Sequence, residues 1–288
     1  MLTDQHAANA ITAAELAEFE ETGYLTVPGA LDTPTIDALE ADVDAIYLEH
    51  LDSGYDPYRK SPLEPTAAFF YPNFLWRSPR FIHLLDHPLT FPKVWGILGW
   101  NIYCFHSHLI VTPPRDTRAR GTGRTFFHQD SGRVNFDLEV HPRPRLSVKV
   151  VFWLSDCSEP GRANLYVVPG SQRNDLLERP EDGSLPDGAI PVCGKPGDAV
   201  IFDRRLWHSS SPNDSDVTRK GLFLGYGYRW LRPKDDMTIS EEQMARQDPI
   251  RRQLLGDSSD NNHRFTPLPE DTPLKTWLES SGLLQDIG

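Results

Sequence analysis

The sequence predicts a mainly β protein in which one sandwich or barrel is wrapped by helices from both ends of the chain. From about residue 101 to 232, short β-prone segments are separated by turn signals, with no helical pattern between them. Helix start signals and apolar positions at helical spacing occur instead before residue 50 and after residue 233. All-β folds of this size often form one unit, so we expect residues 1–288 to be a single domain.

The N-terminal region, expected to span about 12–100, opens with a helix, a strand and a second helix. Thr12 and Glu15 have the spacing of a capping box, and Gly23 is suited to end the helix. The β-prone segment 24–27 follows, and Pro34 then fits the first turn of another helix. The apolar positions of this second helix recur at helical spacing, and they are Ile36, Leu39, Val43, Ile46 and Tyr47.

The remaining elements follow from the same signals. Residues 51–100 are rich in proline and aromatic residues, with a helical patch around 81–85. The expected β core, about 101–232, contains strand candidates at 102–111, 146–154, 164–168, 189–193, 199–202 and 221–230. The C-terminal tail, about 233–288, contains helix candidates near 240–255 and 272–281.

The composition argues against several classes of protein. A formal net charge of -12 disfavours a general nucleic-acid binder, which needs a basic surface. No apolar run approaches the ~18 residues of a membrane span, and the N-terminal residues lack the pattern of a secretion signal. The 3 cysteines form no C-x-x-C pair, so a disulfide scaffold is not expected. We therefore expect a cytoplasmic globular protein without nucleic-acid or membrane partners.

Several other patterns carry no prediction of chemistry. The chain lacks the G-x-x-x-x-G-K, H-E-x-x-H and G-x-S-x-G motifs. Carboxylate clusters such as Asp235-Asp236 are interpreted as solvated loops. Cys104 lies among apolar neighbours in a predicted strand, so it is interpreted as a buried, inert thiol.

One constellation indicates a metal site. His128 and Asp130 are two residues apart, so in a strand their side chains would face the same point. A third ligand is needed, and the best candidate is His208, after a turn, an apolar strand and a short exposed stretch. Two histidines and one carboxylate form the facial triad of non-haem Fe(II) oxygenases. On these three residues alone, polar surface or core residues without a metal explain the pattern equally well.

A second feature follows His208 in the sequence. Arg219 shares a predicted strand face with Gly221, Phe223, Gly225 and Gly227. Three glycines on one face indicate that another group approaches the strand closely. An arginine above such a cavity is suited to bind a carboxylate through two hydrogen bonds. The alternative is a glycine-kinked barrel corner with an exposed arginine.

Taken in order, these and further motifs resemble the phytanoyl-CoA dioxygenase-like family of Fe(II)/2-oxoglutarate oxygenases. The resemblance runs from Phe19 to Trp230, about three quarters of the chain. Its landmarks are the N-terminal Gly-Tyr-Leu-Thr-Val-Pro-Gly, His128-Gln-Asp130, Leu165-Tyr-Val-Val-Pro-Gly-Ser171, Pro196-Gly-Asp198, and His208 with Arg219. Their joint occurrence in this order is more specific than any single motif.

The resemblance implies a fold and a metal site. The implied fold is a double-stranded β-helix, a jelly-roll barrel of the cupin type. His128, Asp130 and His208 match the family's Fe(II) ligands. Arg219 matches the residue that anchors the distal carboxylate of 2-oxoglutarate.

Further positions are assigned to the co-substrate. Ser210 matches a position that assists the same carboxylate, and Trp153 matches an aromatic residue that packs beside the co-substrate. Lys149 shares a strand face with Trp153, so burial of its ammonium requires a nearby anion, and it is assigned to 2-oxoglutarate or substrate. Many relatives carry a glutamine on an early strand. His106 either replaces that glutamine or is an ordinary core histidine, and the role of His108 stays open.

The implied activity is the hydroxylation of a small molecule, such as an acyl derivative, an amino-acid derivative or a secondary metabolite. O2 and 2-oxoglutarate are consumed, and succinate and CO2 are released. Related halogenases have a small residue in place of the carboxylate, so Asp130 favours hydroxylation over halogenation, with desaturation or ring chemistry as lesser alternatives. A cupin-like metal-dependent hydrolase or isomerase and a non-catalytic jelly-roll ligand-binding domain remain open. Neither requires the carboxylate anchor that Arg219 and Ser210 would provide.

A local excess of arginine predicts the character of the substrate. Seven arginines lie between Arg115 and Arg145, where the chain average would place about three basic residues. Basic groups at the mouth of a cleft concentrate anions. We therefore predict an anionic substrate, held by some of Arg118, Arg120, Arg124 and Arg133. The alternative is that these arginines pair with surface acids, and the sequence indicates neither the identity of the substrate nor the oligomeric state.

Overall fold

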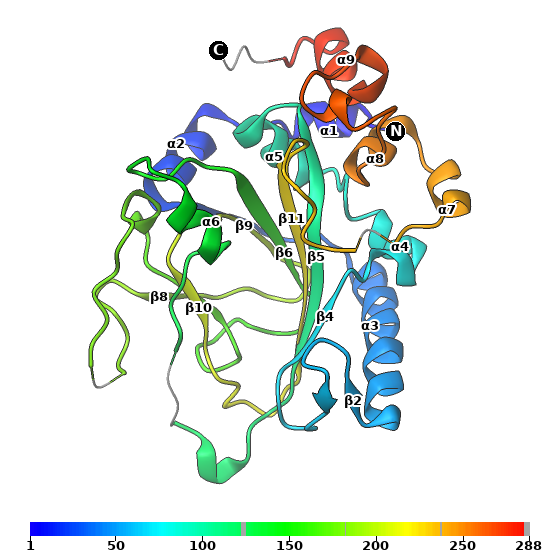
Figure 1. Ribbon diagram of the computed structural model, residues 1–288. Coiled ribbons are helices and arrows are strands. Elements are labelled where there is room, and N and C mark those ends of the chain that lie inside the picture. Colours follow the sequence, from blue (N-terminus) through cyan, green and yellow to red (C-terminus); the bar gives the residue numbers. More distant parts are fainter. Residues whose placement is uncertain (122–124, 182, 237, 285–288) are drawn as a thin grey trace.

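The computed structural model describes residues 1–121, 125–181, 183–236 and 238–284, whose strands form two main antiparallel sheets (Figure 1). The larger sheet has the strand order β1-β9-β6-β11-β5-β4. Its strands are β1 (Tyr24–Val27), β4 (Phe69–Pro72), β5 (Ile102–Thr112), β6 (Ser147–Trp153), β9 (Ala199–Asp203) and β11 (Arg219–Tyr228). The smaller sheet has the order β10-β7-β8, formed by β7 (Leu165–Val167), β8 (Ile190–Val192) and β10 (His208–Ser210). The short strands β2 (Tyr55–Asp56) and β3 (Ser61–Pro62) pair separately.

The two sheets have the arrangement of a jelly roll, so the predicted mainly β fold with flanking helices is confirmed. They share no strand within the described ranges, and the jelly roll is therefore not closed into a continuous barrel. A single bridge between His128 and His208 extends the smaller sheet by one residue pair. In the larger sheet, β11 lies between β5 and β6, and its pairing with β5 shifts register between Gly225 and Tyr226.

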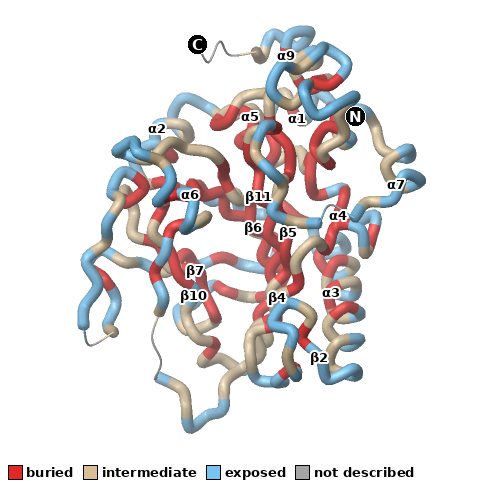
Figure 2. The backbone as a smooth tube through the Cα atoms, in the orientation of Figure 1, coloured by how far each residue is buried: buried red, intermediate tan, exposed pale blue. Residues whose placement is uncertain are grey.

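Alternation along the central strands divides the buried side chains into two layers. In β6, Val150 and Phe152 belong to the layer that the helices cover, whereas Val151 and Trp153 belong to the layer that includes the smaller sheet. Figure 2 shows that these central strands are the most continuously buried part of the backbone. The second layer forms the floor of the candidate site.

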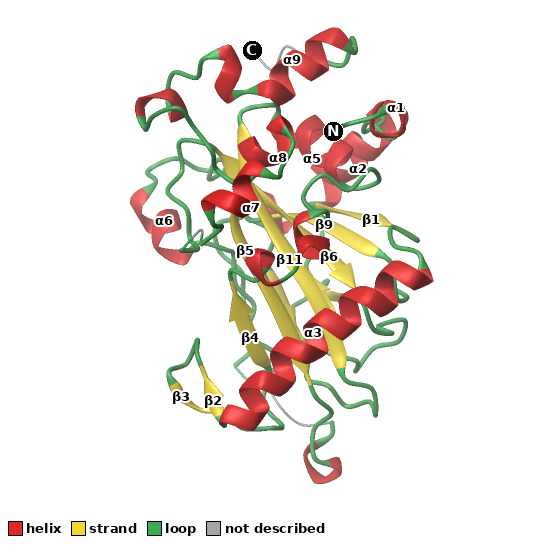
Figure 3. Ribbon diagram, turned by 90° about the vertical axis from the view of Figure 1, so that its right-hand side faces the viewer, coloured by secondary structure: helices red, strands yellow, loops and turns green. Residues whose placement is uncertain are grey.

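The first two predicted helices are present, and the first has its predicted caps. Helix α2 (Ala13–Thr22) has a capping box between Thr12 and Glu15 and ends at Gly23, whose φ of 84° is left-handed. Helix α3 (Thr33–Ser53) is capped by Asp32 and buries Ile36, Leu39, Val43 and Ile46. Figure 3 shows α3 lying across the face of the larger sheet. Because this helix covers one face, the opposite face of the sheet is left for the site.

The other helices are short. They are α1 (Asp4–Ala8), α4 (Pro79–Ile82), α5 (Phe91–Leu98), α6 (Gly132–Asp137), α7 (Glu241–Ala245), α8 (Pro249–Leu254) and α9 (Pro273–Ser280). Turns of 3₁₀-helix occur at Leu75–Arg77, Thr117–Ala119, Ser171–Arg173, Asn262–Arg264 and Pro269–Asp271. None of the helices in the described ranges is long and apolar enough to span a membrane.

Two parts of the element prediction differ from the structure. The predicted helix near 240–255 is wrong as one element, because Asp248 caps a new helix that begins at Pro249. In the proline-rich region, β4 and α5 were not predicted, since their hydrophobic runs are short and lack a clear period.

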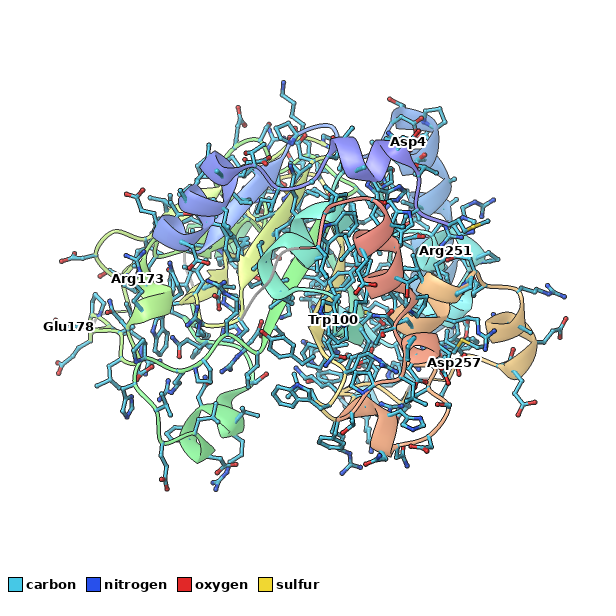
Figure 4. All side chains as sticks on the ribbon, turned by 90° about the horizontal axis from the view of Figure 1, so that it is seen from above. Asp4, Trp100, Arg173, Glu178, Arg251 and Asp257 are labelled. Carbon is cyan, nitrogen blue, oxygen red and sulfur yellow. The ribbon has the colours of Figure 1, made fainter. Side chains whose placement is uncertain are left out.

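The N-terminal residues lie beside the C-terminal tail. The Met1 ammonium is 2.9 Å from Oδ2 of Asp248. Seen from above, Asp4 lies on the same side of the molecule as Asp257, and Arg173 lies on the opposite side, in the connection between β7 and β8 (Figure 4). Residues from both ends of the chain therefore pack at one end of the larger sheet, away from the smaller sheet.

Candidate metal and co-substrate site

A cavity of about 270 Å³ lies between the two sheets. Its walls come from β4, β5, β6, β9 and β11 of the larger sheet and from β7 and β10 of the smaller one. The lining residues are Tyr58, Phe70, His106, His108, Ile110, His128, Asp130, Lys149, Leu165, Phe202, His208, Ser210, Arg219, Phe223 and Lys234. Aromatic and titratable side chains therefore line the cavity together, as in the contacts of Phe202 with Lys149 and of Phe223 with Arg219.

Three residues predicted from the sequence meet in this cavity. Ligand atoms of His128, Asp130 and His208 lie within 4.8 Å of one another. His208 begins β10, and the backbone amides of His128 and His208 each donate to the carbonyl of the other, at 2.9 and 3.0 Å. The two imidazoles are therefore placed by backbone pairing between segments far apart in the sequence.

The predicted strand at His128–Gln–Asp130 is replaced by an irregular turn. His128 forms only an isolated bridge, and the amide of Asp130 donates to the carbonyl of Arg204 at 2.8 Å. Ser131 then takes a left-handed φ of 60° and α6 begins. Alternation nevertheless survives, because the side-chain amide of Gln129 donates to the carbonyls of Asn174 and Arg205 instead of lining the cavity.

Backbone carbonyls fix the orientation of both imidazoles. Nδ1 of His208 lies 2.8 Å from the carbonyl oxygen of Leu206, and Nδ1 of His128 lies 3.1 Å from that of Phe126. A carbonyl oxygen only accepts hydrogen bonds, so each Nδ1 carries a proton, and Nε2 is the nitrogen of each ring that remains to bind a metal. Burial lowers the pKa of His208 to about 3, which keeps this imidazole neutral.

Asp130 supplies the negative charge of the cluster. Burial acts to raise the pKa of Asp130, but the Lys149 ammonium and the two histidines outweigh this effect and hold it well below its usual value. The Lys149 Nζ lies 2.8 Å from Oδ2 of this carboxylate. Two imidazoles and one ionised carboxylate are the donor set that suits a divalent iron centre with open positions. The residues present therefore fit such a metal.

A buried cation lies in the same cavity. Arg219, at the start of β11, is 2% exposed, and its guanidinium carbon lies 4.6 Å from the ring centre of Trp153 and 5.2 Å from that of Phe223. It forms no ion pair with a carboxylate in the described part of the chain, and its Nε has no hydrogen-bond partner there. Burial lowers the pKa of Arg219 to about 10, so the guanidinium remains charged at neutral pH. A buried guanidinium without an anion is suited to receive one.

The glycine face of β11 is explained by the aromatic residues. A Cβ atom on Gly221 would lie 3.1 Å from Cζ3 of Trp153 and 3.2 Å from Cε2 of Phe223. The group that approaches this glycine is therefore the Trp153 ring, which stacks under Arg219. Ser210 ends β10 and also lines the cavity.

Sequence reasoning missed one carboxylate near the site. The interpretation of Asp235 as a solvated residue is wrong, because its side chain is 2% exposed and its Oδ1 lies 2.5 Å from Nδ1 of His106. Asp236 remains exposed. Nothing local distinguishes the two acids, since the burial of Asp235 depends on a strand 129 residues earlier in the chain.

The predicted substrate arginines lie elsewhere. Arg120 pairs with Asp216, and Arg133 pairs with Asp137 on the exposed surface of α6. Arg118 is exposed, and none of these three lines the cavity. Arg124 lies outside the described residues. Lys234 is the further cation that does line the cavity, and it has no carboxylate partner within the described ranges.

Comparison of the sequence with known families finds one that covers most of the chain. The sequence profile of the family described as Phytanoyl-CoA dioxygenase (PhyH) matches residues 19–221. Among curated proteins, the chain is similar to the dioxygenase cdmD of Talaromyces verruculosus, with 23% identity over 94% of this chain and 90% of that protein.

Solved structures share the fold. The chain is similar to HygX from Streptomyces hygroscopicus with nickel and 2-oxoglutarate bound, with a TM-score of 0.59 and 18% identity over 78% of this chain and 90% of that one. It is also similar to EctD from S. alaskensis with bound Fe, with a TM-score of 0.59 and 22% identity over 82% of both chains. At these identities the likeness establishes the jelly-roll fold.

Proposed function

This chain belongs to the phytanoyl-CoA dioxygenase family of Fe(II)- and 2-oxoglutarate-dependent oxygenases, and we propose that it oxidises a small molecule in the cavity between its two sheets. The observation that carries this proposal is the pairing of two features in one cavity. A His–Asp–His cluster lies at one place, and a buried arginine without an anion lies at another. The first fits Fe(II) and the second fits the distal carboxylate of 2-oxoglutarate.

Each side chain is given a defined role. His128 and His208 would ligate iron through Nε2, and Asp130 would do so through a carboxylate oxygen. Bound iron supplies O2 activation, coupled to the conversion of 2-oxoglutarate into succinate and CO2. The polypeptide orients the reactants and shields them from water.

The co-substrate would lie along the aromatic floor of the cavity. Arg219 would hold the distal carboxylate with help from Ser210, and the rings of Trp153 and Phe223 would exclude water from that contact. Lys149 already pairs with Asp130, so we assign its ammonium first to that carboxylate and only then to 2-oxoglutarate or substrate. The Asp130 carboxylate is then the nearby anion that burial of the Lys149 ammonium requires.

Hydroxylation is the proposed reaction, because Asp130 occupies the place that must be small for a halide to bind. The proposed substrate is a small molecule with an anionic group. Lys234 carries this part of the proposal, since it lines the cavity and pairs with no described carboxylate. Arg118, Arg120, Arg124 and Arg133 would then act at most on the approach of the substrate.

An anaerobic titration tests the proposal. Fe(II) and 2-oxoglutarate added together should produce a visible charge-transfer band, and replacement of His128, Asp130 or His208 by Ala should weaken or abolish it. His141→Ala serves as the control, because His141 is an exposed histidine outside the cavity. An unchanged band in all three ligand variants would contradict the assignment. Metal-dependent turnover without any requirement for 2-oxoglutarate would instead favour a cupin-like hydrolase or isomerase.

A further inference from the structure

A histidine–aspartate pair forms part of the wall of the cavity, and the proposed reaction does not use it. His106 lies on β5, and its Nδ1 is 2.5 Å from Oδ1 of Asp235. The other oxygen of Asp235 accepts from both the backbone amide and the hydroxyl of Ser107. His106 lies within residues 19–221, which the family profile matches, and Asp235 lies beyond them.

The hydrogen bonds around Asp235 fix the tautomer of His106. The Ser107 amide can only donate, and its hydroxyl donates to the same oxygen, so the carboxylate acts as an acceptor throughout. Nδ1 of His106 must then carry a proton, which leaves the lone pair on Nε2. Burial lowers the pKa of His106 despite the nearby Asp235, so the imidazole stays neutral.

The free nitrogen belongs to a residue that lines the cavity. Nε2 of His106 forms no hydrogen bond within the described part of the protein, whereas Nδ1 contacts Asp235. His108, two residues further along β5, has its ring between those of Phe70 and Phe223, at 4.6 and 4.5 Å, and the His106 ring packs against it at 4.7 Å. The contacts with Asp235 and His108 therefore hold the His106 ring, which presents Nε2 as an oriented hydrogen-bond acceptor.

The strand register places this acceptor on the metal side of the cavity. Gly225 of β11 pairs with His106 on one side and with Lys149 on the other, and Lys149 contacts Asp130. Two strand spacings put the backbones of His106 and Lys149 about 10 Å apart. Gly225 has no side chain to fill the space between them. Arg219 lies six residues away along β11, about 20 Å at the usual rise, so the proposed 2-oxoglutarate anchor is at the other end.

We propose that Nε2 of His106 accepts a hydrogen bond from a hydroxyl or amine group of the substrate, and that Asp235 is the positioning residue that holds this nitrogen toward the metal side. The inference rests on the proposed function and specifies one part of its substrate, a hydrogen-bond donor close to the oxidised carbon. If His106 only stabilised the fold, its contact with Asp235 through Nδ1 would be sufficient. Substrate binding would need Nε2 as well, so substitutions that replace one nitrogen at a time distinguish the structural role from the binding role.

Two substitutions separate these roles. In His106→Asn, the amide nitrogen can occupy the place of Nδ1 and keep the contact with Asp235, but nothing replaces Nε2. In His106→Gln, the longer side chain can place an acceptor near the position of Nε2, but the contact with Asp235 is lost. Asp235→Asn disturbs the positioning alone. Asp236→Asn is the matched control, because Asp236 is the adjacent acid and is exposed.

The probes are alicyclic alcohols and primary amines that also carry a carboxylate, each with its O- or N-methylated partner. They are chosen because Phe70 and Ile110 make the neighbouring wall apolar and Lys234 would hold the anionic group. 4-Hydroxycyclohexanecarboxylate and 3-hydroxyadamantane-1-carboxylate represent the alcohols, and their amino counterparts represent the amines. Binding to the enzyme loaded with Mn(II) and 2-oxoglutarate is measured by calorimetry, and succinate release is measured with Fe(II). In the native protein we expect at least one alcohol or amine to bind at least about tenfold more tightly than its methylated partner.

The variants should change this preference in a defined order. His106→Asn should bind the two partners equally, His106→Gln should retain part of the preference, and Asp235→Asn should weaken it while raising KM for the probe more than it lowers kcat. The Asp236→Asn control should match the native protein. A preference that persists in His106→Asn, or the absence of any binding among these alcohols and amines, would overturn the inference.

The Fe(II)–2-oxoglutarate band should be the same in all these proteins. Loss of this band in His106→Asn would show that His106 binds 2-oxoglutarate, which would overturn the inference. Absence of the band in the native protein would overturn the proposed function itself.

Discussion

The Nζ atom of Lys149 lies 2.9 Å from Oδ1 and 2.8 Å from Oδ2 of Asp130, so one ammonium contacts both oxygens of a carboxylate that we propose as a metal ligand. Both side chains are largely buried, at 14% and 13% exposed. When one partner of such a pair is removed, the charge that remains is left in a poorly solvated place.

Lys149→Met should therefore destabilise the metal-free protein more than the metal-loaded one. Without a metal, the lone Asp130 carboxylate should reduce the free energy of unfolding by about 3 kcal/mol. A bound divalent cation would supply the missing positive charge and reduce this loss. Urea unfolding with EDTA, and again with Mn(II) and 2-oxoglutarate, measures the difference. Lys220→Met is the matched control, because Lys220 is equally buried and pairs with Glu40 and Asp44, residues that do not line the cavity. Equal losses for Lys149→Met under both conditions would contradict the prediction.

Arg219→Ala should raise KM for 2-oxoglutarate by at least about tenfold, since charge-assisted hydrogen bonds contribute ~1.5–3 kcal/mol each and ~1.4 kcal/mol is one decade. Arg219→Lys should restore part of the loss, because it keeps the charge but not the fork of two donors. Steady-state succinate release measures both. Arg252→Ala, an exposed arginine on α8, should leave KM unchanged. If Arg219→Ala has no effect, another cation such as Lys149 holds that carboxylate.

Gly221→Ala should disturb the arginine indirectly. The added methyl group would lie against the rings of Trp153 and Phe223, which both contact the Arg219 guanidinium. Overpacking of this kind costs ~1–3 kcal/mol, and the displaced rings should also raise KM for 2-oxoglutarate. Thermal unfolding and succinate release report the two effects. Gly132→Ala is the comparison, because a Cβ atom there would meet nothing within 4 Å. Equal Tm and KM values for the two variants would show that the Trp153 and Phe223 rings move aside without loss of stability or of 2-oxoglutarate binding.

Acidification should destabilise the protein partly through His87. Burial lowers the pKa of His87 from 6.5 to about 4, and its ring packs edge-on against Phe152. Between these values the unfolded chain binds a proton that the folded chain excludes, so stability is lost as the pH falls from about 6.5 toward 4. In His87→Gln the decrease in Tm over this range should be shallower, whereas exposed His141→Gln should follow the native curve. Parallel curves for all three proteins would show that His87 does not contribute.

Local signals predicted much of the fold. The Thr12 capping box and the apolar face of α3 depend on residues within a few positions of one another, and both are present. The long strands β5, β6 and β11 were predicted because their apolar content is sustained over several residues. The break before Pro249 was missed because the apolar pattern continues past this position. The helical backbone does not, since the residue before a proline is disfavoured in the helical conformation.

Contacts between distant segments could not be predicted in the same way. The motif order placed His128, Asp130 and His208 as candidates, but their meeting depends on a backbone bridge across 80 residues. The burial of Asp235 depends on β5, and the sequence around it gives no sign of this. The arginines between 115 and 145 are a local cluster whose pairing could not be predicted either. Their carboxylate partners, among them Asp216 and Asp203, lie far along the chain.

The reciprocal backbone hydrogen bonds between His128 and His208 have a consequence for how iron would enter and leave the protein. Because these bonds join main-chain atoms, the two imidazoles are held together whether or not an ion is present. Metal uptake would then need no folding step of its own, and the same polypeptide could exchange iron repeatedly. Oxygenases of this chemistry are exposed to oxidation of their iron, and a binding site that persists while empty allows a damaged centre to be reloaded.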